Sequence, residues 1–311
     1  MKQQKIAITI RSFGTDPDCL EKLKTHFTIS YQNTNGLRLS EEELAIAMRG
    51  AHGVIAGTER YTEKVIRSSA DLKVISRVGV GTDNIDKEAA RKAGISIVNT
   101  PIAPADAVAE HTLTLILCCL KNICRYNSAA RIHNVTTGIP PGLMLKDKVC
   151  GIIGMGRIGK RVAVILLAFG CKVIYFDPYI KEEIPEMQKA GTLDEIIAAS
   201  DILTLHTPSL KGGERIISRR TLPLCKEGVI IINTARGSLI DEEILIKGLK
   251  ARKIRALGLD VFVKEPYSGP LENFPEVIMT PHIASNTVES RGEMEREAVQ
   301  NLISALRGRE S

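Results

Sequence analysis

A glycine-rich turn between two apolar runs constrains the fold of this 311-residue chain more than any other feature of its sequence. The segment 149–179 reads VCGIIGMGRIGKRVAVILLAFGCKVIYFDPY. Apolar residues form a short run at 149–153, recur at helical spacing after Gly159, and form a second run at 172–176 that ends on Asp177. This order predicts a strand, a helix and a second strand, with the glycine turn between the first strand and the helix.

Each glycine of the turn has its own role in a dinucleotide site. Gly154 permits a tight turn, Gly156 lets the backbone approach a pyrophosphate, and Gly159 lets the helix pack close to the strand. The free N–H groups that open the helix then hold the phosphates. Asp177 follows Gly159 by 18 residues, where its carboxylate can accept hydrogen bonds from both ribose hydroxyls and repel a 2′-phosphate. The sequence therefore predicts NAD as the cofactor, rather than NADP.

The length and composition indicate two globular domains. A chain of 311 residues is long for one core, and 44% hydrophobic with 25% charged residues is typical of a globular protein. The N-terminus shows no cleavage site, so we expect no secretion, and the apolar stretch 113–120 is too short to span a bilayer. We expect a cytoplasmic protein without a membrane partner.

The distribution of cysteines and of basic residues argues against a metal site and against a nucleic-acid partner. The seven cysteines form no CxxC pair and most lie in apolar runs, so we expect small core residues in a reducing compartment and no metal site. The net charge is +6, but Lys and Arg are scattered and aromatic residues make up only 4%. We therefore expect no nucleic-acid partner.

Strand-like and helix-like segments alternate along most of the chain. This alternation predicts an α/β fold in which helices cover both faces of parallel sheets. In the first hundred residues the expected strands are 6–10, 27–31, 54–56, 74–76 and 95–98, and the expected helices lie near 18–24, 41–48, 62–68 and 86–93. Later strands are expected at 202–206, 229–232, 256–259 and 277–279, and helices at 193–199, 241–250 and 287–306. We expect the last helix to return to the first domain.

A long apolar helix is predicted over Ala105–Arg131, before a loop at Thr136–Gly142. The helix is longer than one small domain needs, so we expect it to bridge the domains or to pack against a second subunit. It contains His111, which we interpret as a hydrogen-bonded structural histidine rather than a catalytic one.

Polar residues follow several of the later strands, where open α/β sheets bind their ligands. Three ionisable residues stand out among them: Arg236, Glu265 and His282. Here the sequence resembles the D-isomer-specific 2-hydroxyacid dehydrogenases, and within them most closely the D-3-phosphoglycerate dehydrogenase branch. The resemblance covers nearly the whole chain. It is carried by RVGVGTDNID (77–86), GIIGMGRIG (151–159), FDPY (176–179), NTARGSLIDE (233–242), LDVFVKEP (259–266) and TPHIAS (280–285).

The resemblance implies two Rossmann-like domains with the active site in the cleft between them. Residues 1–99 with 286–311 would form the substrate-binding domain, and residues 100–285 the NAD-binding domain. A homodimer through the helix 105–131 is also implied. By analogy His282 acts as the base, Glu265 orients it and favours its protonated form, and Arg236 binds the substrate carboxylate and polarises the carbonyl.

The resemblance also assigns binding residues. For the substrate carboxylate it implies the backbone N–H groups of Val80 and Gly81, together with Arg236. For the cofactor it implies Arg157 and Ile158 at the turn, Thr207 near the adenine, and Thr234, Ala235, Asp260 and Ala284 near the nicotinamide.

Two departures from the phosphoglycerate branch affect the expected substrate. Gly57 and Thr58 stand where that branch often carries an arginine for the phosphate, and the segment after Pro101 lacks the usual asparagine. Arg60 and Arg77 are the possible substitutes. The sequence ends at Ser311, so we expect no regulatory domain and no serine feedback.

D-3-phosphoglycerate is therefore the first expected substrate, and glyoxylate or hydroxypyruvate reduction is the alternative. We do not expect formate oxidation, because the family members that oxidise formate carry glutamine where this chain has Glu265. An alternative of another class is an NAD(H)-sensing corepressor, which shares the fold and similar Arg, Glu and His residues. Turnover of 2-oxo acids with NADH distinguishes an enzyme from a sensor.

Overall fold

The computed structural model describes residues 3–132 and 138–308, which divide into two compact units. Unit 1 comprises Met1–Pro104 and Ser285–Ser311, and unit 2 comprises Ala105–Ala284. Each unit is built on one parallel sheet, which confirms the predicted α/β fold class. The expected division into residues 1–99 with 286–311 and residues 100–285 stays a prediction, because it also assigns a ligand to each part.

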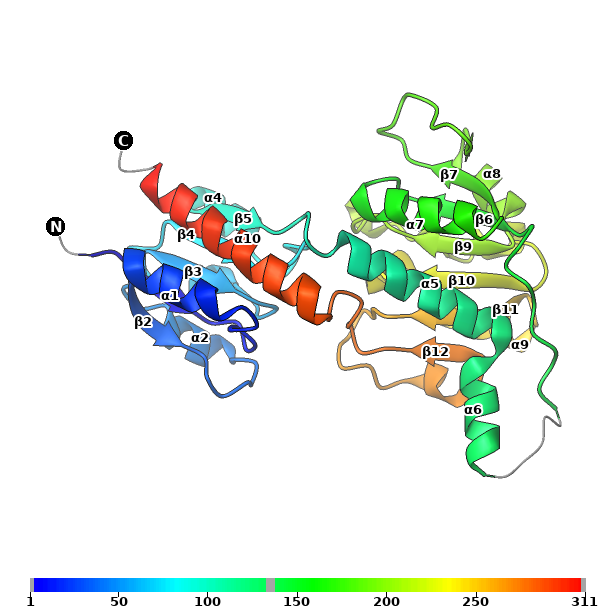
Figure 1. Cartoon of the computed structure of the whole chain (residues 1–311), viewed down its shortest axis with the longest axis horizontal. Helices are drawn as coiled ribbons and strands as arrows, with labels where there is room; N and C mark the ends of the chain where they lie inside the picture. Colours follow the sequence, from blue (N-terminus) through cyan, green and yellow to red (C-terminus); the bar gives the residue numbers. More distant parts are fainter. Residues whose placement is uncertain (1–2, 133–137, 309–311) are drawn as a thin grey trace. The chain divides into compact units, whose positions relative to one another are not determined.

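Unit 1 is a five-stranded sheet with helices on both faces (Figure 1). The strand order β2-β1-β3-β4-β5 is a doubly wound order in which ligands bind beyond the carboxyl ends of the strands. The strands are β1 (Lys5–Ile8), β2 (Thr28–Gln32), β3 (Gly53–Ala56), β4 (Val74–Arg77) and β5 (Ser96–Asn99). The helices are α1 (Pro17–His26), α2 (Glu41–Ala47), α3 (Glu63–Arg67), α4 (Lys87–Lys92) and α10 (Val288–Arg307).

The last helix, α10, returns to the sheet of unit 1, as expected from the sequence. Leu302 and Leu306 of α10 pack in one core with Ile6 and Ile55, and the Ser76 hydroxyl donates a hydrogen bond of 2.8 Å to the Ala298 carbonyl. These contacts bring the two ends of the chain into one unit.

Unit 2 is a seven-stranded parallel sheet in the order β12-β11-β10-β9-β6-β7-β8. The strands are β6 (Val149–Ile153), β7 (Lys172–Phe176), β8 (Gln188–Lys189), β9 (Ile202–Leu205), β10 (Val229–Asn233), β11 (Ile254–Leu259) and β12 (Val277–Met279). The helices are α5 (Ala105–Lys121), α6 (Ile123–Arg131), α7 (Arg157–Ala168), α8 (Leu193–Ala199) and α9 (Glu242–Lys250), with short 3₁₀ turns at Lys211–Gly213, Leu222–Leu224, Gly237–Leu239 and Pro270–Asn273. The strand order reverses between β6 and β9, so this pair forms the topological switch point.

The strands of unit 2 supply two cores, one on each face of the sheet. Along β10, Ile230 and Ile232 pack with α5 and α7, whereas Val229 and Ile231 pack with α8 and α9. This alternation follows from the two-residue period of a strand. Figure 1 shows α5 and α7 across one face of the sheet. Each fully buried isoleucine contributes about 1.5–3 kcal/mol relative to an exposed one, so these cores fix the strand ends that carry the polar residues.

The prediction of a single helix over Ala105–Arg131 is wrong, because the structure has two helices there. The helix breaks at Asn122, whose φ of 53° is left-handed, and α5 and α6 meet at a bend of 63°. The Asn122 side chain donates to the Pro140 carbonyl at 2.9 Å, and asparagine tolerates this backbone conformation better than most residues. Among the described residues no single helix is long and apolar enough to cross a membrane, although α5 and α6 taken together meet the requirements of length and composition.

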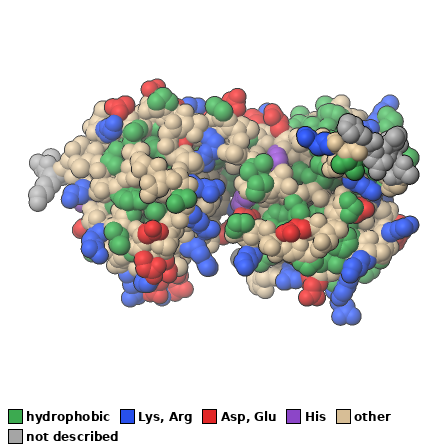
Figure 2. All heavy atoms as spheres, turned by 90° about the horizontal axis from the view of Figure 1, so that it is seen from below, with side chains coloured by type: hydrophobic (Ala, Val, Ile, Leu, Met, Phe, Trp, Pro, Cys, Tyr) green, Lys and Arg blue, Asp and Glu red, His purple; other side chains and the backbone are tan. Residues whose placement is uncertain are grey.

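Two further expectations concern cysteines and charge. Five of the seven cysteines are buried, as expected, but Cys124 is exposed because α6 buries none of its residues. On the face seen in Figure 2, both units carry Lys and Arg side chains as well as Asp and Glu side chains. The absence of a nucleic-acid partner stays a prediction. Of the loop predicted at 136–142, residues 136 and 137 lie outside the described residues.

Candidate active site

The turn after β6 has the geometry that requires glycine at two positions. Gly154 has a φ of 95°, and a Cβ atom there would lie 2.5 Å from the His206 carbonyl oxygen. A Cβ atom at Gly159 would overlap the Gly154 carbonyl oxygen. The first glycine therefore makes the turn against the end of β9, and the third allows α7 to lie against the turn.

The start of α7 leaves its backbone donors available. Gly156 is the N-cap residue and supplies no side chain. Apart from its two chain neighbours, no described residue has an atom within 4 Å of the position that a Cβ atom would take. By contrast, Thr192 and Thr287 cap α8 and α10 with their hydroxyls. The N–H groups of Arg157 and Ile158 thus open onto free space at the positive end of a helix, which suits a phosphate group.

Asp177 lies beside this turn. Its Oδ2 accepts a hydrogen bond of 2.8 Å from the Met155 N–H, and its Oδ1 accepts one of 2.9 Å from the Tyr179 N–H. Each carboxylate oxygen can accept a further bond. The turn, the uncapped helix start and the carboxylate therefore fit a dinucleotide.

The next two strand ends place three of the expected cofactor residues. Thr207 follows β9, and its backbone nitrogen lies 3.0 Å from the Cβ position at Gly154, so it borders the turn. Thr234 follows β10 and contacts the hydroxyl of Thr112 at 3.0 Å. The Ala235 N–H donates to the Asn233 side chain at 3.0 Å.

Asn233 organises the loop that carries Arg236. Its side chain is 1% exposed, accepts the Ala235 N–H, and donates to the Arg236 carbonyl at 2.8 Å. Gly237 then lets the loop approach the next strand end, because a Cβ atom there would overlap the backbone of Phe262 and Val263. The position of Arg236 is thus fixed by Asn233 and Gly237. Both lie in the segment 233–242 that carries the resemblance, but the sequence predicted a role for neither of them.

His282 and Glu265 form a hydrogen-bonded pair. His282 Nδ1 lies 2.9 Å from Glu265 Oε2, and the Phe262 N–H donates to Glu265 Oε1 at 3.0 Å. Burial alone would raise the pKa of Glu265, but these two hydrogen bonds and the positive charges of His282 and Arg236 outweigh it and hold the pKa below its usual value. Arg236 therefore lies close enough to act on the pair, and the three predicted ionisable residues gather in unit 2.

Asp260 supports the backbone around His282. Its carboxylate is fully buried and accepts hydrogen bonds from the Ile283 N–H at 2.8 Å, the Ala284 N–H at 2.9 Å and the Thr280 hydroxyl at 2.6 Å. His282 itself has a φ of 57°, a left-handed conformation that costs about 1 kcal/mol or more in a residue other than glycine. The clamp by Asp260 holds this conformation, a role beyond the predicted contact with the cofactor.

His111 joins the same network from α5. Its Nε2 lies 3.0 Å from the Thr280 hydroxyl and 3.6 Å from Asp260 Oδ1, and its side chain is 17% exposed. The expected hydrogen bond of His111 is present, and its structural rather than catalytic role stays a prediction. No metal site emerges in the part of the chain that the structure describes.

In unit 1 the expected substrate residues follow β4. Gly79 has a φ of 127°, and a Cβ atom there would overlap the guanidinium of Arg77, so Arg77 lies against the turn. Thr100 accepts the Gly79 N–H at 2.6 Å. Among the described residues, none accepts a hydrogen bond from the N–H of Val80 or of Gly81. Two consecutive free donors at a strand end can cradle a carboxylate.

This arrangement can move a proton and hold an anion. An imidazole paired with a carboxylate can act as a general base or acid near neutral pH. A guanidinium beside it can bind a carboxylate and stabilise negative charge on a carbonyl oxygen.

Comparison with known proteins gives matches of the same kind. The model of the D-isomer specific 2-hydroxyacid dehydrogenase NAD binding domain matches residues 113–284. The D-3-phosphoglycerate dehydrogenase of Methanocaldococcus jannaschii is 38% identical over 87% of this chain and 52% of the relative. The hydroxypyruvate reductase of Thermotoga maritima is 37% identical over 81% of this chain and 84% of the relative.

A glyoxylate reductase structure from Paecilomyes thermophila has a TM-score of 0.88 at 30% identity, over 98% of this chain and 96% of that one. The chain spans about half the length of the D-3-phosphoglycerate dehydrogenase relative and most of the two reductases.

Proposed function

The chain belongs to the D-isomer-specific 2-hydroxyacid dehydrogenase family, and we propose that it is an NAD-dependent oxidoreductase acting between a small D-2-hydroxy acid and the matching 2-oxo acid. The observation that carries the proposal is the gathering of His282, Glu265 and Arg236 in unit 2, the unit that also holds the glycine turn. Family membership agrees with the resemblance found in the sequence.

The residues divide the chemistry among them. NAD, when bound, accepts a hydride in oxidation and supplies one in reduction. His282 removes the hydroxyl proton in oxidation and returns it in reduction, while Glu265 orients the ring and favours its protonated form. Arg236 binds the substrate carboxylate and stabilises the carbonyl oxygen. The free N–H groups of Val80 and Gly81 give the carboxylate further donors, and Arg77 adds positive charge.

The cofactor residues follow from the same proposal. Gly154, Gly156 and Gly159 shape the turn, the N–H groups of Arg157 and Ile158 hold the pyrophosphate, and Asp177 binds the ribose. The remaining expected contacts are Thr207, Thr234, Ala235, Asp260 and Ala284. Unit 2 is then the NAD-binding part and unit 1 the substrate-binding part.

D-3-phosphoglycerate is the first substrate that we propose, and hydroxypyruvate or glyoxylate reduction is the alternative. The relatives carry names of all three kinds. Gly57 and Thr58 at the end of β3 offer no charge to a phosphate, so Arg60 or Arg77 must supply it if the substrate is phosphorylated.

Initial rates with NADH on phosphohydroxypyruvate, hydroxypyruvate, glyoxylate and pyruvate test this proposal. We expect turnover of at least one 2-oxo acid and the highest kcat/KM on phosphohydroxypyruvate. Faster reduction of hydroxypyruvate or glyoxylate supports the alternative substrates. No turnover of any acid, with NADH binding retained, contradicts the enzyme and supports the corepressor-like sensor.

A homodimer in the cytoplasm belongs to the same proposal. Ile123 and Ile132, at the two ends of α6, are 50% and 72% exposed, and α6 buries no residue within its own chain. A helix that buries none of its residues within its own chain leaves these side chains available to a second copy. The seven free cysteines suit a reducing compartment. A monomeric mass in solution contradicts the dimer.

A further inference from the structure

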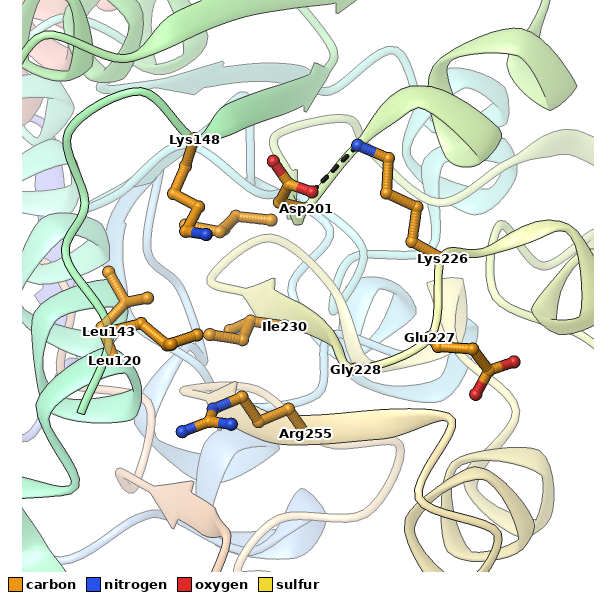
Figure 3. Close-up of a pocket in the computed structure, with 10 residues that line it drawn as sticks. Leu120, Leu143, Lys148, Asp201, Lys226, Glu227, Gly228, Ile230 and Arg255 are labelled. Atoms are coloured by element: carbon orange, nitrogen blue, oxygen red, sulfur yellow. Dashed lines mark hydrogen bonds and ion pairs between the residues drawn. The ribbon is translucent and has the colours of Figure 1, made fainter. Parts of the chain in front are cut away.

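A cavity of about 200 Å³ opens at the amino edge of the sheet of unit 2, the edge opposite the candidate active site. Lys148 and Asp201 directly precede β6 and β9, Gly228 directly precedes β10, and Arg255 is the second residue of β11. Figure 3 shows these strand ends around one pocket. Every residue that lines it belongs to unit 2, and neither the fold nor the proposed reaction uses it.

The two acidic residues at the pocket each form an ion pair with a lysine. Asp201 accepts hydrogen bonds from the Lys226 ammonium at 2.9 Å and from the Val149 N–H at 2.8 Å. Glu227 pairs with Lys253 at 2.9 Å, and Figure 3 shows its side chain pointing away from the pocket. Among the described residues, neither acid forms an ion pair with Lys148 or Arg255.

Lys148 and Arg255 bring two positive charges to the pocket. In Figure 3 the Lys148 side chain runs from the start of β6 into the pocket, and the Arg255 guanidinium lies on the other side of Ile230. Lys148 has no ion-pair partner among the described residues. Arg255 donates through Nη2 to the Pro141 carbonyl at 2.8 Å, whereas its buried Nε finds no acceptor in the described chain. A buried donor without a partner is costly and suits an external acceptor.

The two charges lie at opposite ends of an apolar surface. The strand order places β9 and β10 between β6 and β11, so the backbones that carry Lys148 and Arg255 are three strand spacings, or about 14 Å, apart. Ile202 of β9 and Ile230 of β10 line the pocket between them, with Leu120 and Leu143 on the side. The two long side chains thus reach the apolar surface from different strands, which suits a molecule with an acidic group at each end.

We propose that this pocket binds a short aliphatic dicarboxylate, with one carboxylate at Lys148, the other at Arg255, and the methylene chain against Ile202 and Ile230. The cavity holds about seven water molecules by liquid volume, which is enough for such a molecule. Charge-assisted hydrogen bonds at the two ends select the length of the dicarboxylate. The apolar surface between them disfavours a ligand with polar branches.

Calorimetric titration of the whole protein with succinate, glutarate and adipate tests the proposal. The Arg236→Ala variant is used throughout, because Arg236 is the carboxylate-binding residue of the candidate active site. We expect saturable binding with an optimum chain length, and binding of pentanoate, which lacks the second carboxylate, weaker by about tenfold or more. Equal binding of pentanoate and glutarate overturns the proposal, and so does inorganic phosphate that binds as tightly as the best dicarboxylate.

Substitutions locate the ligand. In the same background, Lys148→Gln and Arg255→Gln should each weaken binding of the best dicarboxylate by about tenfold. Lys172→Gln is the matched control, because Lys172 starts β7 at the same edge of the sheet but does not line the pocket. Unchanged binding in both pocket variants, or equal loss in the control, overturns the proposal. If Arg255→Gln fails to fold, Lys148→Gln and the comparison with pentanoate decide.

Binding seen in the unsubstituted protein that disappears in Arg236→Ala also overturns the proposal, because the ligand then occupies the candidate active site. That result leaves the proposed dehydrogenase function intact. Absence of turnover in the rate measurements contradicts the proposed function instead, and leaves the dicarboxylate site unaffected.

Discussion

His282 Nδ1 lies 2.9 Å from Glu265 Oε2, although the two residues come from loops after different strands. Glu265 follows β11 and His282 follows β12, and β11 pairs with β12 in parallel register. Because parallel strands end at the same edge of a sheet, the pairing of the strands brings the pair together. Asp260, which directly follows β11, then accepts hydrogen bonds from the two backbone N–H groups after His282 and from the Thr280 hydroxyl before it.

Replacement of His282 tests its role as base and acid. His282→Ala should lower kcat for 2-oxo acid reduction by about two orders of magnitude or more, because no other group replaces the proton donor. The affinity for NADH, measured by fluorescence titration, should stay nearly unchanged. His26→Ala in α1 of unit 1 serves as the control and should keep full activity. A His282→Ala enzyme with normal kcat removes the histidine from the mechanism.

The charge of Glu265 should contribute to the stability of the fold in a way that depends on pH. Its pKa is lowered in the folded chain from an ordinary value of 4.5, so its charged form stabilises the fold at neutral pH. This contribution is complete above about pH 4.5 and is lost as the pH falls through the lower folded value. The free energy of unfolding of Glu265→Gln, from urea titration, should therefore differ more from the original protein at pH 7 than at pH 3. A difference that grows toward acid pH contradicts the lowered pKa.

Much of the fold was predictable because apolar runs and strands coincide. Val149–Ile153 and Lys172–Phe176 are strands over the predicted residues, since their side chains are buried on both faces of a parallel sheet. The edge strand β8 was missed, because two residues give no period. The break at Asn122 was missed as well, because its cause is a hydrogen bond to Pro140, which lies 18 residues further on.

The ionisable residues of the site could be predicted from the sequence, but the contacts that hold them in place could not. Arg236, Glu265 and His282 follow strand ends, and strand ends can be located from the sequence. The clamp by Asp260 depends on the buried carboxylate reaching two N–H groups and the Thr280 hydroxyl, 20 or more residues further on. Contacts over such a separation depend on how β11 and β12 pack, so no local pattern indicates them.

Asp177 should set the choice of cofactor. Its carboxylate lies beside the glycine turn, where we expect it to repel the 2′-phosphate of NADP. Asp177→Ala should reduce the ratio of kcat/KM for NADH over NADPH by at least about tenfold. Asp194→Ala is a control of equal charge, because Asp194 lies in the first turn of α8 and pairs with Arg220 on the surface. An unchanged ratio in Asp177→Ala refutes the proposed role.

Gly237 should be essential for the position of Arg236. A Cβ atom at residue 237 would overlap the backbone of Phe262 and Val263, and backbone atoms cannot rotate away as a side chain can. Gly237→Ala should lower the free energy of unfolding by about 1–3 kcal/mol and raise KM for the 2-oxo acid, because the loop must move and carries the guanidinium with it. Gly292→Ala is the control, since its Cβ would make only an ordinary contact of 3.5 Å with the Arg296 side chain within α10. There the loss of a helical glycine should stabilise the protein by about 0.5–1 kcal/mol. A Gly237→Ala protein with unchanged stability and KM shows that the loop tolerates the added methyl group and that Phe262 does not fix Arg236.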